Sequence, residues 1–285
     1  MKKIDFIGVG VPRSATTWLG ECLASHPEIN FSSQFCKKEI NFFSDNYKKG
    51  IDWYLNLFPN EKGKIQGEYS PTYFWNKTVA DRIKKHLPNV KIIITIRNPV
   101  DMIYSLYWMA FNAIQVDRPS NFDQAVKADM TEELKLFRAL YADRISQYLS
   151  LFPRKNVQFI LFDDIYKDPK QVIRVMYSFL EVSDDFKPEN LSNRINRAEK
   201  TRSNYLKLVL RSIVNGLNRP GLRLIRRRLL NNLTLYKIYS KINKEDTKYP
   251  PMREETRLKL INYYREDILQ TEKLIGRNLS QWLKA

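Results

Sequence analysis

Residues 6–20 read FIGVGVPRSATTWLG, an apolar run followed by a turn and the start of a helix-like run. The same order of strand, turn and helix occurs in phosphate-binding loops, whose nucleotide-triphosphate form reads G-x-x-x-x-G-K-[ST]. Counted from Gly10, Ala15 stands where the second glycine belongs and Thr16 where the lysine belongs. The stretch therefore predicts a turn at the end of a strand, and the missing lysine and glycine count against an ATPase or GTPase.

The turn itself carries groups that suit an anion. Backbone N–H groups at a helix N-terminus and the helix dipole favour negative charge. Arg13 adds a fixed cation, and Ser14, Thr16 and Thr17 add hydroxyl donors. The alternative is an ordinary strand, turn and helix in which Thr16 caps the helix. Taken alone, the stretch leaves both interpretations open.

Apolar runs along the rest of the chain alternate between strand-like and helical patterns. Strands are predicted at 4–10, 64–70, 90–97 and 156–162, and helices at 16–25, 76–88, 99–113, 131–151, 168–182 and 253–276. The strand runs are continuously apolar rather than alternating, which predicts a parallel sheet covered by helices on both faces. We therefore expect an α/β fold with a central parallel β-sheet.

Three of the predicted strands end in polar residues. The first runs into VPRSATT (11–17), the second into EYSPTY (68–73) and the third into RNPVD (97–101). In folds of this class ligands bind beyond the carboxyl ends of the strands. Arg97, with the hydroxyl of Ser105 in the following helix, can bind a second phosphate, separate from one held by the first loop.

Composition limits the protein class. The chain has 285 residues, of which 43% are hydrophobic and 13% aromatic, so it can bury a large core. Two cysteines, Cys22 and Cys36, make no disulfide framework and no metal site, which favours a reducing compartment and a cytoplasmic location. No run approaches the roughly 20 apolar residues of a membrane span. We expect one domain over 1–285, in which about 185–250 forms an irregular basic cap.

The net charge of +17 is unevenly placed. Residues 200–244 contain twelve Lys or Arg and no Asp or Glu. Leucine and isoleucine recur there at helical spacing, which suits packing on the core, an acidic acceptor, or peripheral contact with an anionic membrane. Two rival functions remain from charge and loop: a basic module that binds anions or membranes, and a degenerate P-loop nucleotide kinase or hydrolase.

Several stretches together resemble the PAPS-dependent sulfotransferases. GVPRSATTWL (10–19) resembles their 5′-phosphosulfate loop, and IRNPVDMIYSLYW (96–108) their 3′-phosphate motif. KKEINFFSDNYKKGIDWYLNLFP (37–59) and GEYSPTYF (67–74) are similar to blocks of the heparan-sulfate-type branch, the first to the block with its catalytic glutamate. FPRKNVQFILFDDIYKDPKQVIRVMYSFLEV (152–182) and the stretch 248–283 also resemble later blocks of bacterial members.

The resemblance implies a P-loop-like three-layer fold and sulfuryl transfer from 3′-phosphoadenosine 5′-phosphosulfate (PAPS), with the product PAP. The acceptor is a hydroxyl or amine of a glycan, lipid or small metabolite; no metal and no specific nucleic acid are implied. Glu39 falls on the general base, and Arg13 on a catalytic cation. The residues that fall on cofactor contacts are Arg13, Ser14, Ala15, Thr16, Thr17, Trp18, Arg97, Ser105, Lys248 and Tyr249.

The sequence departs from the family pattern at three positions. Arg13 replaces a lysine and keeps the charge, and Ala15 replaces a glycine, which removes freedom for positive φ in the turn. Tyr69 stands where many members of the branch have lysine, and Lys38 could supply that charge. Lys38, Glu68 and Tyr69 are assigned to substrate binding.

The base could also be a histidine, because some cytosolic members use one. The chain has only His26 and His86, and each follows or ends a predicted helix. Both are expected to be structural. Glu39 is therefore the first candidate for the base, and Glu68 the second carboxylate, with an orienting role.

Overall fold

The central sheet has five parallel strands in the order β2-β3-β1-β4-β5. Their bounds are β1 Phe6–Gly10, β2 Ile29–Phe31, β3 Ile65–Tyr69, β4 Lys91–Ile96 and β5 Val157–Leu161. The computed structural model describes residues 3–32, 39–59, 61, 63–112, 122–127, 139–192, 199–201, 244–246 and 249–285. Strand β1 lies between β3 and β4, with Ile7 opposite Glu68 on one side and Ile92 on the other. The carboxyl ends of these three strands therefore meet at one edge.

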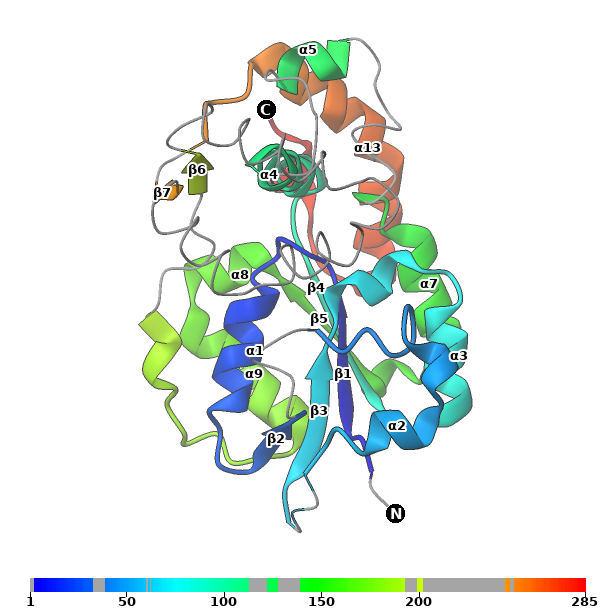
Figure 1. Ribbon diagram of the computed structural model, residues 1–285. Helices are drawn as coiled ribbons and strands as arrows, with labels where there is room; N and C mark the ends of the chain where they lie inside the picture. Colours follow the sequence, from blue (N-terminus) through cyan, green and yellow to red (C-terminus); the bar gives the residue numbers. More distant parts are fainter. Residues whose placement is uncertain are drawn as a thin grey trace, which may run out of the picture. The chain divides into compact units, whose positions relative to one another are not determined.

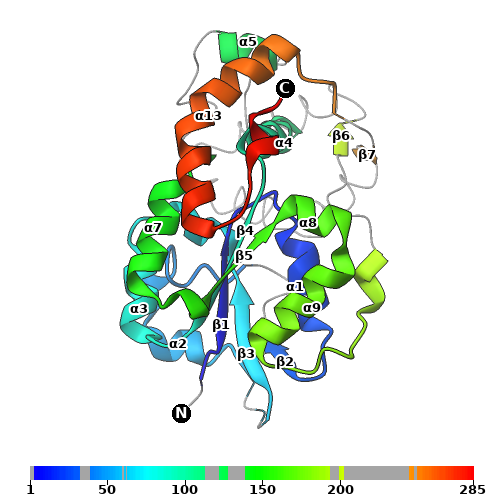
Figure 2. The same cartoon turned by 180° about the vertical axis from the view of Figure 1, so that it is seen from behind.

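Helices cover both faces of the sheet, as Figure 1 shows. One face carries α1 (Thr16–Ala24), α8 (Phe162–Lys167) and α9 (Pro169–Leu180), and the other carries α2 (Ile51–Leu55), α3 (Val79–His86) and α7 (Ala142–Leu151). The view from behind in Figure 2 gives the same two groups. This three-layer arrangement confirms the predicted fold class.

The structure describes further elements, among them the helices α4 and α13. They are α4 (Pro99–Asn112), α5 (Phe122–Lys127), β6 (Glu199–Thr201), β7 (Lys244–Asp246), α13 (Glu254–Ile275) and the 3-10 turns η1 (Tyr47–Lys49), η2 (Pro71–Trp75), η4 (Arg154–Asn156), η5 (Glu189–Ser192) and η6 (Ser280–Leu283). β6 and β7 pair antiparallel. No helix among the described residues is long and apolar enough to cross a membrane.

The chain divides into two compact units. The first comprises Met1–Met102, Leu136–Ile195 and Leu258–Ala285 and contains the five-stranded sheet. The second comprises Ile103–Lys135 and Asn196–Arg257. Most of the predicted basic cap lies in 202–243, outside the described residues.

The predicted helix 131–151 is not helical just before Ala142, and its part at 131–138 lies outside the described residues. In the described part of this segment, which begins at residue 139, α7 starts only at Ala142. A residue remote in sequence determines where α7 starts, because the Asp267 carboxylate accepts hydrogen bonds from the backbone N–H groups of Tyr141 (2.7 Å) and Ala142 (2.9 Å). A carboxylate of α13 thus caps α7, which local sequence could not indicate.

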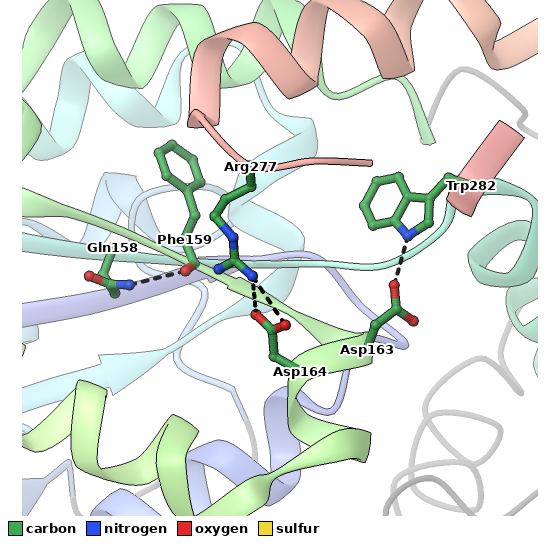
Figure 3. Close-up of polar contacts among 6 residues, drawn as sticks. All are labelled: Gln158, Phe159, Asp163, Asp164, Arg277 and Trp282. Carbon is green, nitrogen blue, oxygen red and sulfur yellow. Dashed lines mark hydrogen bonds and ion pairs between the residues drawn. The ribbon is translucent and has the colours of Figure 1, made fainter. Parts of the chain in front are cut away.

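The C-terminal segment is held on α8 by two side-chain contacts, drawn in Figure 3. The indole Nε1 of Trp282 donates to Asp163 at 2.7 Å. Arg277 pairs with both carboxylate oxygens of Asp164, at 3.1 and 2.9 Å. These contacts tie the end of the chain to the first turn of the helix that follows β5.

Candidate functional site

The loop after β1 has an unusual backbone. Arg13 and Ala15 adopt left-handed conformations, with φ of 67° and 62°. Alanine in place of glycine was expected to remove this freedom, and that expectation is wrong, because Ala15 takes the positive φ in spite of its Cβ. The surrounding fold holds a conformation that costs a non-glycine residue roughly 1–2 kcal/mol.

The helix that follows the loop starts without a side-chain cap. α1 begins at Thr16, and Ala15 occupies the N-cap position, where its methyl group can accept no hydrogen bond. The alternative in which Thr16 caps the helix is therefore wrong. The N–H groups of the first turn, with the positive end of the helix dipole, are left for another acceptor.

A buried hydroxyl lies in the same loop. The Ser14 side chain is fully buried, and its Oγ has no hydrogen-bond partner among the described residues. A buried hydroxyl without a partner costs free energy. Thr16 is also buried, whereas Thr17 is exposed. The loop thus contains a donor that an anion could satisfy.

Arg97 connects the end of β4 to this loop. Its Nη1 donates a hydrogen bond of 3.1 Å to the backbone carbonyl of Arg13, and its guanidinium lies 4.3 Å from the centre of the Phe162 ring. The backbone carbonyl of Arg97 accepts a hydrogen bond of 2.9 Å from the buried hydroxyl of Tyr141. Side chain and main chain of Arg97 are therefore both held by neighbours.

Two arginine charges lie close together at this edge. Burial, the largest effect, lowers the pKa of Arg97 from its usual value, and the neighbouring charge of Arg13 lowers it further, while Asp101 and Asp163 oppose the change. Arginine nevertheless stays protonated in proteins. Two guanidinium groups that repel each other in a partly buried place form a site that an anion would stabilise.

Beside the loop, β3 carries a buried carboxylate. Glu68 is 1% exposed, and its Oε1 accepts hydrogen bonds from the hydroxyls of Tyr54 and Tyr73, both at 2.9 Å. Its Oε2 accepts one from Ser70 at 2.7 Å. We call Glu68, Tyr54, Ser70 and Tyr73 the carboxylate cage. Burial raises the pKa of Glu68 to about 7, although the three hydroxyls lower it and the charge of Glu39 raises it.

The proposed base lies on the segment that covers this cage. Glu39 is exposed, yet desolvation by the surrounding protein raises its pKa, while a hydrogen bond with the Asn41 side chain lowers it. The backbone N–H of Asn41 donates to Ser70 Oγ at 3.2 Å. Ser70 follows β3 directly, and its own N–H donates to the carbonyl of Gly8 in β1. Glu39 therefore lies at the same edge of the sheet as the loop.

Two assigned residues of the first unit are buried in the core. Trp18 is 5% and Tyr69 4% exposed, and both belong to one hydrophobic cluster with residues of α1 and α9. The Tyr69 ring packs against Gly8, where an added Cβ would collide with it. Their contacts with cofactor or substrate stay predictions, as does the contact of Glu68 with substrate.

Of the residues assigned in the second unit, Ser105 is buried in α4, and Tyr249 is half-buried. The ring of Tyr249 stacks on that of Trp108, with 5.7 Å between the ring centres and an angle of 13° between the ring planes. In the same unit Tyr104 donates from its hydroxyl to the carbonyl of Pro250. Lys38 and Lys248 lie outside the described residues.

Both histidines have structural contacts. His26 is 2% exposed; its Nε2 lies 2.9 Å from the carbonyl of Ser183, and its Nδ1 accepts from the N–H of Glu28. His86 Nε2 lies 2.9 Å from the hydroxyl of Tyr47. The expectation that both histidines are structural agrees with these contacts.

Sequence reasoning missed the partners that hold the site residues. These are Asn41, Tyr54, Ser70, Tyr73, Tyr141 and Phe162. Two of them, Ser70 and Tyr73, belong to the quoted stretch after β3, whose hydroxyls were a signal. Tyr54, Tyr141 and Phe162 come from distant elements and give no local signal.

Comparison with known proteins gives a family. The sulfotransferase domain model matches residues 3–214. The chain is 26% identical over 298 residues to bifunctional heparan sulfate N-deacetylase/N-sulfotransferase 2 of Bos taurus, with 98% of this chain and 30% of that protein covered. It is 28% identical over 194 residues to bifunctional heparan sulfate N-deacetylase/N-sulfotransferase 1 of Caenorhabditis briggsae, with 62% and 22% covered. The chain thus spans less than a third of the length of these curated relatives.

A solved structure agrees over the whole chain. The crystal structure of a sulfotransferase from Alicyclobacillus acidocaldarius superposes with a TM-score of 0.70 at 25% identity, and the match covers 100% of both chains. The similarity to this structure and the match of the sulfotransferase domain model, which spans most of the sequence, indicate the same class of enzyme, the sulfotransferases. The chain therefore belongs to the sulfotransferase family of transferases.

Proposed function

We propose that the protein transfers a sulfuryl group from PAPS to a hydroxyl or amine of a carbohydrate or other small acceptor. The observation that carries the proposal is the loop after β1, where an uncapped helix N-terminus, the buried Ser14 hydroxyl and two close arginines meet. Each of these features favours an anion. The match to the sulfotransferase domain model supports a sulfuryl donor as that anion.

The loop residues fit the phosphosulfate end of the donor. Arg13, Ser14, Thr16 and Thr17 offer a cation, hydroxyls and backbone N–H groups of the first helical turn. The hydroxyl of Ser14, which lacks a partner among the described residues, would gain one on binding. We assign Ala15 and Trp18 to the same end, Arg97 and Ser105 to the 3′-phosphate, and Lys248 and Tyr249 to the adenosine side.

PAPS supplies the sulfuryl group and, as leaving group, the phosphate of PAP. The acceptor oxygen or nitrogen bonds to sulfur while the sulfur–oxygen bond to the 5′-phosphate breaks, and the electron pair stays on that phosphate. Glu39 takes the proton that the acceptor loses, and its raised pKa brings it nearer to the pH at which a general base works best. Arg13 and the loop N–H groups stabilise the negative charge that develops on the leaving side.

The acceptor class follows the relatives, whose names describe N-sulfotransferases of heparan sulfate. We therefore propose a glycan or an amino sugar first, and another small metabolite second. Glu68, Tyr69 and Lys38 remain our proposed residues on the acceptor side. A degenerate kinase or a basic membrane-binding module is the alternative that the test below excludes or supports.

The test compares PAP with ATP as ligands. Saturating PAP should raise the melting temperature by several degrees, because a ligand at 100 times its Kd stabilises the native state by about 2.7 kcal/mol. ATP should raise it much less, since its phosphates all lie at one end. An equal shift by ATP would contradict the donor assignment. Glu39→Gln should bind PAP like the parent protein in the same melting experiment. It should lose turnover when labelled PAPS and a mixture of acceptors are supplied and the products are detected by mass spectrometry.

A further inference from the structure

The carboxylate cage is connected to the proposed base by hydrogen bonds. Two of its three hydroxyls, Ser70 and Tyr73, also accept hydrogen bonds from backbone N–H groups: that of Asn41 at 3.2 Å and that of Phe43 at 3.1 Å. The segment 39–43 is therefore attached to the cage at two points of its main chain. Because a backbone N–H must find a partner when it is buried, both bonds constrain where this segment lies.

The attachment reaches Glu39 through Asn41. The nearby Asn41 side chain lowers the pKa of Glu39, and its Oδ1 accepts a hydrogen bond of 2.8 Å from Thr72 Oγ1. With its oxygen held by Thr72, Asn41 presents its amide N–H groups to the glutamate. Asn41 also adopts a left-handed φ of 48°, a conformation that neighbours must hold in place.

The direction of these bonds depends on Glu68. An ionised carboxylate only accepts, so each of its three hydroxyl partners must donate its single hydrogen to it. Ser70 and Tyr73 are then left with lone pairs, and these receive the N–H groups of Asn41 and Phe43. A neutral amide in place of Glu68 has one oxygen and carries hydrogens of its own. It could not orient all the hydroxyls in the same way.

We infer that Glu68 is a positioning residue for this reaction: through Ser70 and Asn41 it holds the main chain and side chain that place Glu39. The inference rests on the proposed function, in which Glu39 is the base. Glu68 itself is buried, and among the described residues its carboxylate accepts hydrogen bonds from three hydroxyl groups of the protein. This positioning role acts through the cage and needs no contact between Glu68 and the acceptor.

The protonation state of Glu68 should also affect the reaction. The groups that face it are the phenols of Tyr54 from α2 and Tyr73 from η2, the Ser70 hydroxyl, and the carboxylate of Glu39. Burial raises its pKa to about 7, so the ionised form that orients the cage is gained near neutral pH. The reaction should therefore lose rate on the acid side of this value faster in the parent protein than in Glu68→Gln, whose residue 68 does not titrate.

Hydrogen exchange tests the positioning without any need for activity. In Ser70→Ala the backbone N–H of Asn41 should lose protection, and in Tyr73→Phe that of Phe43, each by at least about tenfold. Glu68→Gln should reduce protection at both positions. The matched control is Tyr54→Phe, which removes a hydroxyl that donates to Glu68 but that makes no hydrogen bond with 39–43 among the described residues. It should leave both N–H groups protected, and unchanged protection in all four variants would overturn the inference.

Two further measurements separate this inference from the proposed function. Ser70→Ala should raise the pKa of the Glu39 carboxyl measured by NMR, because the Asn41 hydrogen bond that lowers it becomes looser. It should also lower kcat by about tenfold or more, with KM for the donor within about twofold, since misplacement of a catalytic group affects the chemical step. Ser70→Thr keeps the hydroxyl and should restore kcat.

The outcomes can be told apart. Full turnover in Glu39→Gln would remove Glu39 as base and leave the exchange and NMR results to decide whether Glu68 positions it. Lost protection in Ser70→Ala with an unchanged pKa of Glu39 and unchanged kcat would show that the cage holds only the fold. That result would overturn the inference while the base assignment stands.

Discussion

The guanidinium of Arg97 donates a hydrogen bond of 3.1 Å to the backbone carbonyl of Arg13. The end of β4 is thereby joined to the left-handed turn that follows β1. The same guanidinium lies over the ring of Phe162, at the start of α8. One side chain thus links three connections at the carboxyl edge of the sheet, and its charge lies next to that of Arg13.

Replacement of Arg97 should weaken nucleotide binding more than it weakens the fold. Arg97→Lys keeps a charge but loses the planar fork that can bond a carbonyl and a phosphate together. We expect the Kd for PAP to rise at least about tenfold, which corresponds to about 1.4 kcal/mol. Isothermal titration calorimetry measures this directly.

Arg154 provides a matched control for that variant. Its Nη1 donates to the carbonyl of Val157, and its guanidinium lies 5.0 Å from the ring of Phe159, near the amino end of β5. It therefore makes the same two kinds of contact at the opposite end of a strand. Arg154→Lys should leave the Kd for PAP unchanged, and an equal loss in both variants would refute the assignment of Arg97.

Ala15 should respond to substitution according to its positive φ. Ala15→Gly should change the free energy of unfolding by less than about 1 kcal/mol, because relief of the left-handed strain is offset by the greater entropy of the unfolded chain. Ala15→Val should be strongly destabilising, since a β-branched residue tolerates this conformation poorly. Ala80, a buried alanine of α3, is the control, because valine there meets only packing limits. Similar losses at both positions in urea unfolding would contradict the role of backbone strain.

The sequence predicted the layers better than the details of the site. Largely apolar runs such as 90–97 predicted buried parallel strands, and β4 (Lys91–Ile96) lies within that run. β2, of three residues, and α2, of five, are too short to give a periodic signal. Their positions depend on tertiary contacts instead.

The chemistry of the loop was visible in the sequence, but its geometry was not. Arg13, Ser14 and the end of β4 could be read from the order of strand, turn and helix. The left-handed φ of Ala15 could not, because the residue type argues against it. Nor could the cage around Glu68 be read from the sequence, since Tyr54 joins it from 14 positions earlier.

The stability of the protein should carry a signature of Glu68. Its pKa is about 7 in the folded protein, against the usual value of 4.5. Between these values the native state holds a proton that the unfolded chain has released, so rising pH favours unfolding. The free energy of unfolding should fall across this window by up to about 3 kcal/mol through this group.

Glu68→Gln isolates this contribution. The difference in unfolding free energy between the parent protein and the variant, measured in urea, should shrink or change sign between about pH 5 and about pH 8. The charge of Glu39 faces the same site, so Glu39→Gln in both backgrounds removes that coupling. A difference in unfolding free energy that is constant from about pH 5 to about pH 8 would show that the pKa of Glu68 is not raised in the folded protein.

The two contacts that hold the C-terminal segment on α8 should differ in strength. Trp282 is 3% exposed and combines apolar burial with a hydrogen bond to Asp163, so Trp282→Ala should cost about 3–5 kcal/mol. Trp282→Phe keeps most of the burial and should cost about 1–2 kcal/mol through the lost hydrogen bond. The side chains of Arg277 and Asp164 are 47% and 35% exposed, and solvent screens their ion pair, so Arg277→Ala should cost less than about 1 kcal/mol. Urea unfolding of the three variants ranks them, and a larger loss for Arg277→Ala than for Trp282→Phe would mean that charge, and not burial, holds the end of the chain.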